Sequence, residues 1–150
     1  SSPTPLGYSA AGIVEAVDEG NSRFRVGDRV ACGGAECAFH AEYIAVPDML
    51  VARVPEQVPM WQAAYTTLLS IAMQAVRQTE PRLGDRVLVM GQGLVGLLVT
   101  GLLKANGARV MAEDLDESRR EHASAMGAER VVVSLSQDLQ NEVREWTDGH

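Results

Sequence analysis

The pattern of apolar and polar residues divides the chain into two parts. Before about residue 54, short runs that mix apolar and polar residues are separated by clusters of Gly, Asp, Asn and Pro. This pattern predicts strands over residues 12–17, 24–31 and 42–46, in a small barrel or meander. So few strands cannot close a barrel or cover their own edges, and we expect them to need neighbours.

The segment after Pro59 has its apolar residues spaced as in a helix. From residue 61 to 78, apolar residues recur at helical spacing without Gly or Pro, which predicts a helix that ends before Pro81.

From residue 83 onward, strand and helix patterns alternate. Apolar runs at residues 87–90, 109–112 and 131–133 predict three strands. The first is followed by a predicted helix over 94–106, with Gly107 in the position of a left-handed C-terminal cap.

Two more helices complete the second part. One is expected over residues 118–126, where Ser118 and Glu121 have the spacing of a capping box and Gly127 follows. The last is marked by Leu139, Val143 and Trp146. The order β-α-β-α-β-α predicts a parallel, doubly wound α/β sheet with right-handed crossovers.

Three glycines with G-x-G-x-x-G spacing stand between the first of these strands and its helix. Gly91 would make the tight turn, Gly93 would let the backbone approach a pyrophosphate, and Gly96 would let the helix pack close to the strand. The free N–H groups at the helix start, from Leu94 onward, would bind the phosphates.

Two acidic residues end the next strand. Glu113 and Asp114 follow the glycines by about 20 residues, the spacing of the carboxylate that binds the adenosine ribose. A carboxylate there accepts both ribose hydroxyls and repels a 2′-phosphate, which favours NAD over NADP. In the alternative interpretation, the glycines only turn and pack, and the acids only end a solvated strand. Strand, glycines, helix, strand and acid in register favour the dinucleotide.

Composition narrows the class of protein. Apolar residues make up 46% of the chain and charged residues 22%, as in a globular protein. The net charge is −7 and no basic run occurs, which argues against a nucleic-acid partner. No apolar run is long enough to cross a membrane and no signal peptide opens the chain. Cys32 and Cys37 fit neither a disulfide framework nor a zinc half-site, so we expect a reducing, cytoplasmic setting.

Further segments resemble the medium-chain dehydrogenase/reductase family, the zinc-type alcohol-dehydrogenase-like proteins. The residues that carry this resemblance, beside the glycine motif, are Gly7, 11–14, 24–30, 41–43, Pro47, 63–64 and 83–87. They resemble in particular the sorbitol- and threonine-dehydrogenase-like branch, including two-part oxidoreductases with an additional fused domain.

The resemblance implies the domain organisation. Residues 1–54 would be the C-terminal part of a GroES-like barrel, 55–82 a connecting helical segment, and 83–150 the first half of an NAD(P)-binding Rossmann domain. It also implies that the chain is a fragment of a longer protein. The isolated chain is then expected to expose apolar surface, to self-associate or to be marginally stable, and to be inactive by itself.

The resemblance also bears on the metal. Zinc-dependent members carry Gly-His-Glu where this chain has Gly7-Tyr8-Ser9, and their third ligand falls at Leu68 or one residue away. Tyrosine is a poor zinc ligand and leucine cannot bind zinc. The structural zinc lobe is absent too, so we expect no catalytic zinc.

Another group must then handle the proton. Tyr8 could act as a general acid, or be a strand tyrosine packed at a domain junction. His40 could relay a proton, be a surface histidine, or form half a metal site with Cys37. Thr66 and Thr67 could lie near the nicotinamide, or only satisfy backbone carbonyls.

Arg119 holds the position where the family often places a basic residue near the adenosine ribose; its alternative is a solvated side chain. We therefore predict an NAD(P)-dependent oxidoreductase that transfers hydride between nicotinamide and a small alcohol or carbonyl without the usual zinc. A catalytically silent dinucleotide-binding module or cofactor sensor is the alternative.

Overall fold

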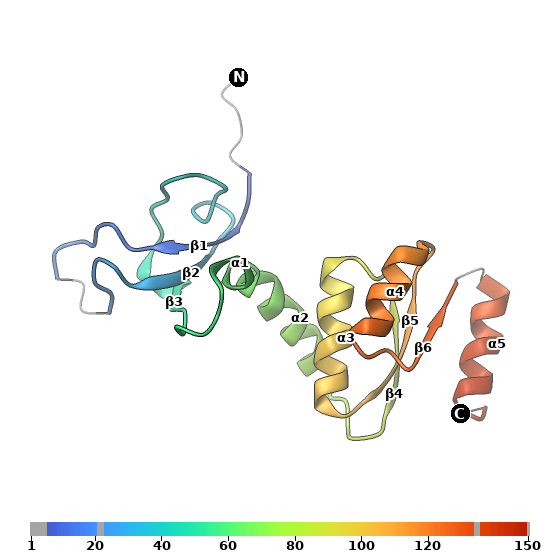
Figure 1. Ribbon diagram of the computed structural model, residues 1–150. Helices are drawn as coiled ribbons and strands as arrows, with labels where there is room; N and C mark the ends of the chain where they lie inside the picture. The colour runs from blue at the N-terminus through green and yellow to red at the C-terminus, as the bar shows by residue number, and fades with distance from the viewer. Residues whose placement is uncertain (1–5, 21–22, 134–135, 150) are drawn as a thin grey trace. The chain divides into compact units, whose positions relative to one another are not determined.

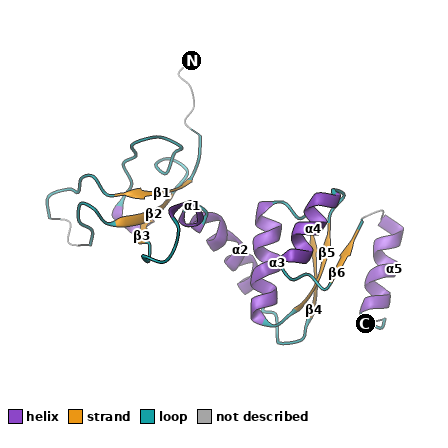
Figure 2. Ribbon diagram, viewed as in Figure 1, coloured by secondary structure: helices purple, strands orange, loops and turns teal. Residues whose placement is uncertain are grey.

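The computed structural model describes residues 6–20, 23–133 and 136–149 and divides the chain into two compact units, residues 1–70 and 71–150 (Figure 1). The division falls within the helix α2 (Thr66–Thr79). The first unit is built on an antiparallel sheet and the second on a parallel sheet (Figure 2). The α/β fold class, with a partial GroES-like part followed by a Rossmann-like part, is confirmed.

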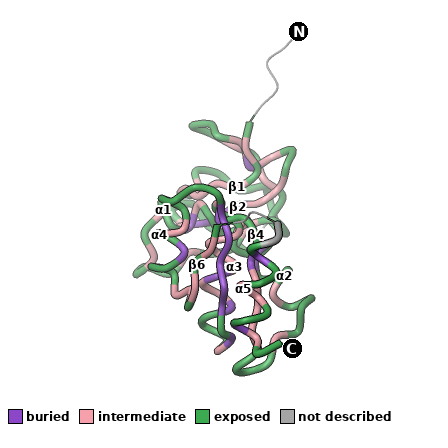
Figure 3. Tube along the Cα trace, turned by 90° about the vertical axis from the view of Figure 1, so that its right-hand side faces the viewer, coloured by how far each residue is buried: buried purple, intermediate pink, exposed green. Residues whose placement is uncertain are grey.

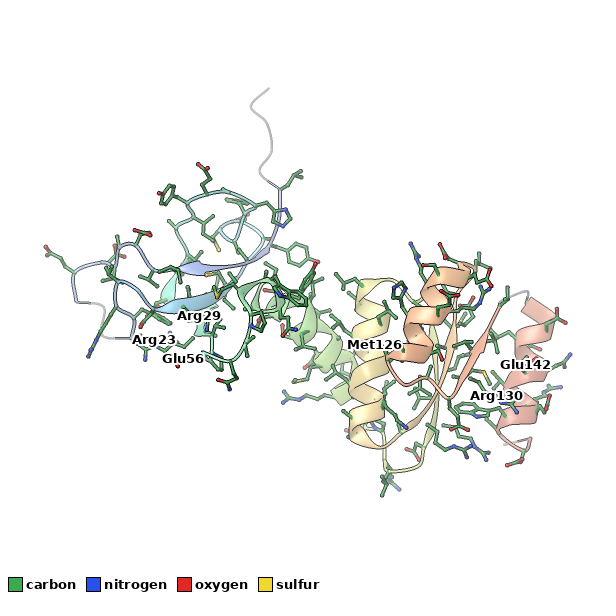
Figure 4. All side chains as sticks on the ribbon, in the orientation of Figure 1. Arg23, Arg29, Glu56, Met126, Arg130 and Glu142 are labelled. Atoms are coloured by element: carbon green, nitrogen blue, oxygen red, sulfur yellow. The ribbon has the colours of Figure 1, made fainter. Side chains whose placement is uncertain are left out.

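The first unit contains three strands in the order β1-β2-β3. They are β1 (Ser9–Ile13), β2 (Arg29–Gly33) and β3 (Val51–Arg53), with a 3-10 turn, η1 (Asp48–Leu50), before the last. Phe24, Val30, Cys32 and Ala38 form its buried core. The guanidinium of Arg29 holds the following loop by donating to the carbonyl oxygens of Pro55, Glu56 and Val58 (Figure 4).

The strands of this unit are displaced from their predicted positions. The strand expected at 12–17 begins and ends earlier, and the one expected at 24–31 is a turn up to Asp28. Gly27 has φ +91°, and the Asp28 carboxylate accepts from the Arg25 N–H at 2.9 Å, so the chain folds back there instead of extending.

No strand forms at 42–46, and this prediction is wrong. Ile44 and Val46 do pack against the core of the unit, so their apolar character reflects burial. Their backbone has no regular structure and follows a bend at residues 41–43. The strand that pairs with β2 on the side away from β1 is β3.

The helix predicted over 61–78 is two helices, α1 (Met60–Ala63) and α2. The Ser9 hydroxyl donates to the carbonyl oxygen of Ala64 at 2.6 Å. In a continuous helix that oxygen would accept from the N–H four residues later, so this bond from β1 stabilises the break.

The second unit follows the predicted alternation closely. Its elements are β4 (Arg86–Met90), α3 (Leu94–Asn106), β5 (Arg109–Glu113), α4 (Glu117–Ala125), β6 (Arg130–Val132) and α5 (Ser136–Trp146). The strands are parallel in the order β4-β5-β6. Gly107 ends α3 with φ +93°, which confirms the predicted left-handed cap.

The core of this unit lies between β4, β5 and the helix α3. It contains Val89, Leu103, Ala108 and Val110, and β5 is buried from Val110 to its end. Figure 3 shows buried segments in purple and exposed ones in green. An ion pair between Arg130 and Glu142, at 3.7 Å, joins β6 to α5 (Figure 4).

The capping box predicted at Ser118 and Glu121 is not how α4 begins. Its N-cap is Asp116, whose carboxylate accepts from the N–H groups of Ser118 and Arg119. Ser118 is already inside the helix, and its role as a cap was wrongly predicted.

Candidate functional site: the glycine loop and the end of β5

The glycine loop leaves β4 by a sharp turn and enters α3. Gly91 has φ +82°, where side chains are strained, and its N–H donates to the carbonyl oxygen of Glu113 at 2.8 Å. Gly96, in the first turn of α3, lies directly against the carbonyl oxygen of Gly91, the first residue after β4.

Gly93 differs from Gly91 in its negative φ of −69° and from Gly96 in having no close neighbour. A Cβ atom built on it meets no protein atom within 4 Å, so the space above the loop is open. Gly93 is also the N-cap of α3, and it supplies no side-chain cap for the helix. The first-turn residues Leu94 and Val95 are exposed. The N–H groups of this turn are thus available to an anion, where the helix dipole favours negative charge.

Asp114 lies beside this loop because β4 and β5 are in register, with Met90 opposite Glu113. Its carboxylate accepts the Gln92 N–H at 2.6 Å and the Asp116 N–H at 2.9 Å. Together with Arg119, whose guanidinium lies 3.7 Å away, these N–H donors lower the pKa of Asp114; the N–H of Asp116 has the largest effect. The carboxylate is held ionised at neutral pH, next to the open space above Gly93.

Arg119 is half of that ion pair, and its side chain is 55% exposed. It lies in the first turn of α4. Glu113, the other acidic residue at this strand end, is buried. The structure therefore brings Gly91, Gly93, Leu94, Gly96, Asp114 and Arg119 together at one end of the parallel sheet.

The sequence interpretation missed Gln92 and Thr100. Both are completely buried, and the Thr100 hydroxyl donates to the Gln92 side-chain oxygen at 3.0 Å. The signal was available, because they are the only polar side chains between residues 87 and 103.

Tyr8 and His40 lie close together in the first unit. The Tyr8 carbonyl oxygen accepts from the Gly34 N–H, and its side chain is 42% exposed. The His40 N–H donates to Leu6, and its imidazole ring rests on Gly7, next to Tyr8. The His40 ring therefore lies beside the backbone that leads into Tyr8.

The first unit offers poor ligands for zinc. Within the described ranges, no group of three or more His, Cys, Asp or Glu residues is arranged to hold a metal ion. Burial raises the pKa of the Cys32 thiol, and the neighbouring Cys37 raises it further. At the residues that replace metal ligands, the Ser9 hydroxyl is committed to Ala64 and Leu68 is apolar. Neither of these two side chains is available to bind a metal ion.

The two threonines of α2 differ. The Thr66 hydroxyl donates to the carbonyl of Ala63 at 2.7 Å, a local helix contact. Thr67 instead reaches β2, where its hydroxyl lies 3.5 Å from the Cys32 carbonyl oxygen. Both threonines line a hollow of about 300 Å³ beside Gly33.

The chain is similar to known proteins in both of its units. The family "Alcohol dehydrogenase GroES-like domain" matches residues 1–56, and "Zinc-binding dehydrogenase" matches residues 95–150. (R,R)-butanediol dehydrogenase of Bacillus subtilis is 31% identical over 99% of this chain and 50% of its own length.

Two solved structures give the same result. A quinone oxidoreductase of Pseudomonas syringae pv. Tomato matches with a TM-score of 0.84 and 32% identity, over 99% of this chain and 46% of that one. Escherichia coli quinone oxidoreductase, solved with NADPH, matches with a TM-score of 0.85 and 28% identity, over 99% of this chain and 47% of that one.

The chain belongs to the medium-chain dehydrogenase/reductase family. Within it, the chain is of the zinc-type alcohol-dehydrogenase-like group. It spans about half the length of the curated family members that it matches first. No helix in the described part of the chain is long and apolar enough to cross a membrane.

Proposed function

We propose that this chain holds the dinucleotide of an NAD-dependent oxidoreductase that acts on a small alcohol or carbonyl compound. The observation that carries the proposal is the open space above Gly93, with the start of α3 on one side and the ionised Asp114 beside it. Leu94 and its neighbours would bind the pyrophosphate, and Asp114 the adenosine ribose. The bound nicotinamide supplies or accepts the hydride.

We propose a preference for NADH over NADPH. Asp114 is buried and ionised, so a 2′-phosphate would meet a fixed negative charge. Arg119 could favour a phosphate, but its guanidinium already faces this carboxylate. One relative is solved with NADPH, so the proposed preference for NADH rests on Asp114 alone.

Titration with NADH and NADPH, followed by nicotinamide fluorescence, tests both proposals. Saturable binding with tighter NADH is expected, and Asp114→Asn should weaken NADH by about tenfold because a charge-assisted bond to the ribose is lost. Asp138→Asn, the same change on an exposed position of α5, is the control. Binding of neither cofactor, or equal loss in both variants, contradicts the proposal.

We propose proton transfer without zinc. In that case Tyr8 Oη, with His40 nearby, would donate a proton to the carbonyl oxygen of the substrate. Turnover is measured on the whole protein that contains this chain. It should hold far less than one zinc per chain, and a chelator should leave its turnover unchanged. Tyr8→Phe should reduce turnover and leave NADH affinity unchanged. Stoichiometric zinc, or full turnover by Tyr8→Phe, would contradict it.

A catalytically silent dinucleotide-binding module is the second candidate. Tyr8 and Ser9 stand where zinc-dependent members have His and Glu. This replacement is as compatible with a loss of catalytic activity as with catalysis that does not use zinc. NADH binding without any turnover across a panel of alcohols, aldehydes, ketones and quinones would favour the silent module.

We also propose that the chain self-associates. In the described sheet, β4 is an edge strand, and its Met90 is 64% exposed. Sedimentation at several concentrations tests this, and a single monomeric species throughout would refute it. A cytoplasmic location stays an expectation from the sequence.

A further inference from the structure

A buried amide lies underneath the glycine loop. Gln92 is the residue between the first two glycines of the motif, yet its side chain is turned inward and is completely excluded from solvent. Thr100, two turns along α3, is buried to the same extent. Neither side chain can contact a ligand in the open space above Gly93, so their role must be internal.

Gln92 makes three hydrogen bonds with three different elements. Its side-chain N–H donates to the carbonyl oxygen of Val89 in β4 at 2.9 Å, and its side-chain oxygen accepts from the Thr100 hydroxyl at 3.0 Å. Its backbone N–H donates to the carboxylate of Asp114 at 2.6 Å. The side chain therefore holds the residue whose backbone binds Asp114.

Packing alone does not explain an amide at this position. A methionine would fill a similar volume without polar atoms to satisfy. A buried amide is stabilising only when its hydrogen bonds are all made, which demands one orientation of the loop. A glutamine at this position therefore fixes the orientation of the loop, and with it the position of the Gln92 N–H relative to the Asp114 carboxylate.

We propose that Gln92, held by Thr100 and Val89, is a positioning residue that sets the cofactor specificity of the dinucleotide site. It fixes the Asp114 carboxylate in the orientation that accepts the ribose diol of NADH and repels the 2′-phosphate of NADPH. The inference rests on the proposed function, because it assumes that Asp114 meets the adenosine ribose.

Two variants remove the anchoring bonds and leave the backbone N–H in place: Gln92→Met and Thr100→Val. Gln92→Met should weaken NADH and ADP-ribose by about tenfold, because the Asp114 carboxylate is then no longer held in the orientation that accepts the ribose. NADPH should lose less affinity. A displaced Asp114 carboxylate would attract the ribose hydroxyls less, but it would also repel the 2′-phosphate less. The ratio of NADH affinity to NADPH affinity should therefore fall. Thr100→Val should shift the ratio in the same direction by less.

The double variant adds a test of coupling. Gln92→Met combined with Thr100→Val should be little worse than Gln92→Met alone, because both changes break the same bond. Gln140→Met, the same substitution on an exposed position of α5, is the control and should change neither affinity.

The result separates positioning from mere stability. A lower melting temperature with an unchanged NADH/NADPH ratio in both variants would overturn the inference, as would unchanged affinities. Hydrogen exchange of the Gln92 N–H, without ligand, gives a second reading. Faster exchange in both variants than in the control supports the anchoring, and equal exchange overturns it.

If the unmodified chain binds neither dinucleotide, the proposed function fails. The hydrogen-exchange comparison still decides whether Gln92 anchors the loop to Asp114. The two failures are therefore distinguishable.

Discussion

Gly96 lies against the carbonyl oxygen of Gly91 so closely that a Cβ atom on Gly96 would overlap that oxygen. The first turn of α3 and the exit of β4 are thus in direct backbone contact. A backbone atom cannot rotate away as a flexible side chain can. The glycine at 96 is therefore required by the packing of the chain itself, whatever the loop binds.

Gly96→Ala should destabilise the fold. We expect a loss of about 1–3 kcal/mol in the free energy of unfolding, the usual cost of overpacking, measured by urea denaturation. Gly101→Ala, in the same helix, is the control. Its Cβ would meet only the flexible end of Met126 (Figure 4), so it should cost far less. Equal losses would show that the contact with Gly91 is not limiting.

Gly93→Ala should weaken cofactor binding more than it weakens the fold, in contrast to Gly96→Ala. Its Cβ would enter open space, so the loss of stability should be limited to the poorer N-cap that alanine provides and should be smaller than for Gly96→Ala. That space is where we place the pyrophosphate, and NADH affinity should fall by about tenfold or more because the methyl group blocks backbone approach. Fluorescence titration and thermal melting of the same samples measure both. Unimpaired NADH binding would place the phosphates elsewhere.

The true cap of α4 can be tested with two alanine variants. Asp116→Ala removes an acceptor for two backbone N–H groups and should cost about 1 kcal/mol of stability. Ser118→Ala should cost little, since its side chain caps nothing in the structure. A larger loss of stability for Ser118→Ala than for Asp116→Ala in urea denaturation would contradict this assignment and support the capping box.

The ion pair between Arg109 and Glu129 predicts a dependence of stability on acid. Hydrogen bonding to Arg109 lowers the pKa of Glu129 from its usual 4.5 to about 2, and Trp146 adds a further bond at 3.5 Å. A lowered pKa means that the folded state favours the ionised form. The contribution is complete above pH 4.5 and is lost as the pH falls toward 2.

Both side chains of this pair are 42% exposed, so screening keeps the contribution below about 1 kcal/mol. Glu129→Gln should therefore lower stability slightly at pH 7 and become equal to the unmodified chain near pH 2. Urea midpoints across this range measure the difference. A constant difference at every pH would assign the loss to packing instead of charge.

The second unit was predictable because its local signals agree with its tertiary structure. The apolar run at 87–90, the three glycines and Gly107 each require one conformation, and β4, the loop and α3 follow them closely. Asp114 was predictable for the same reason, since parallel register places the end of β5 beside the loop.

The first unit depends on contacts between distant residues. The bond from Ser9 to Ala64 that accompanies the break between α1 and α2 joins residues far apart in sequence. Ile44 and Val46 are residue types common in strands. They pack against the core of the unit, but their backbone pairs with no strand. The glycine spacing gives no information on the residue between the glycines. The inward orientation of Gln92 depends instead on its hydrogen bonds to Val89 and Thr100.

The contact of His40 with Gly7 has a consequence for how this sequence can diverge. Gly7 has φ +101°, and a Cβ there would lie 2.7 Å from the imidazole Nε2. A larger residue at position 7 is therefore compatible only with a smaller or displaced one at position 40. The two positions should covary among homologous sequences, and selection from a library that randomises both should recover pairs that neither single library contains.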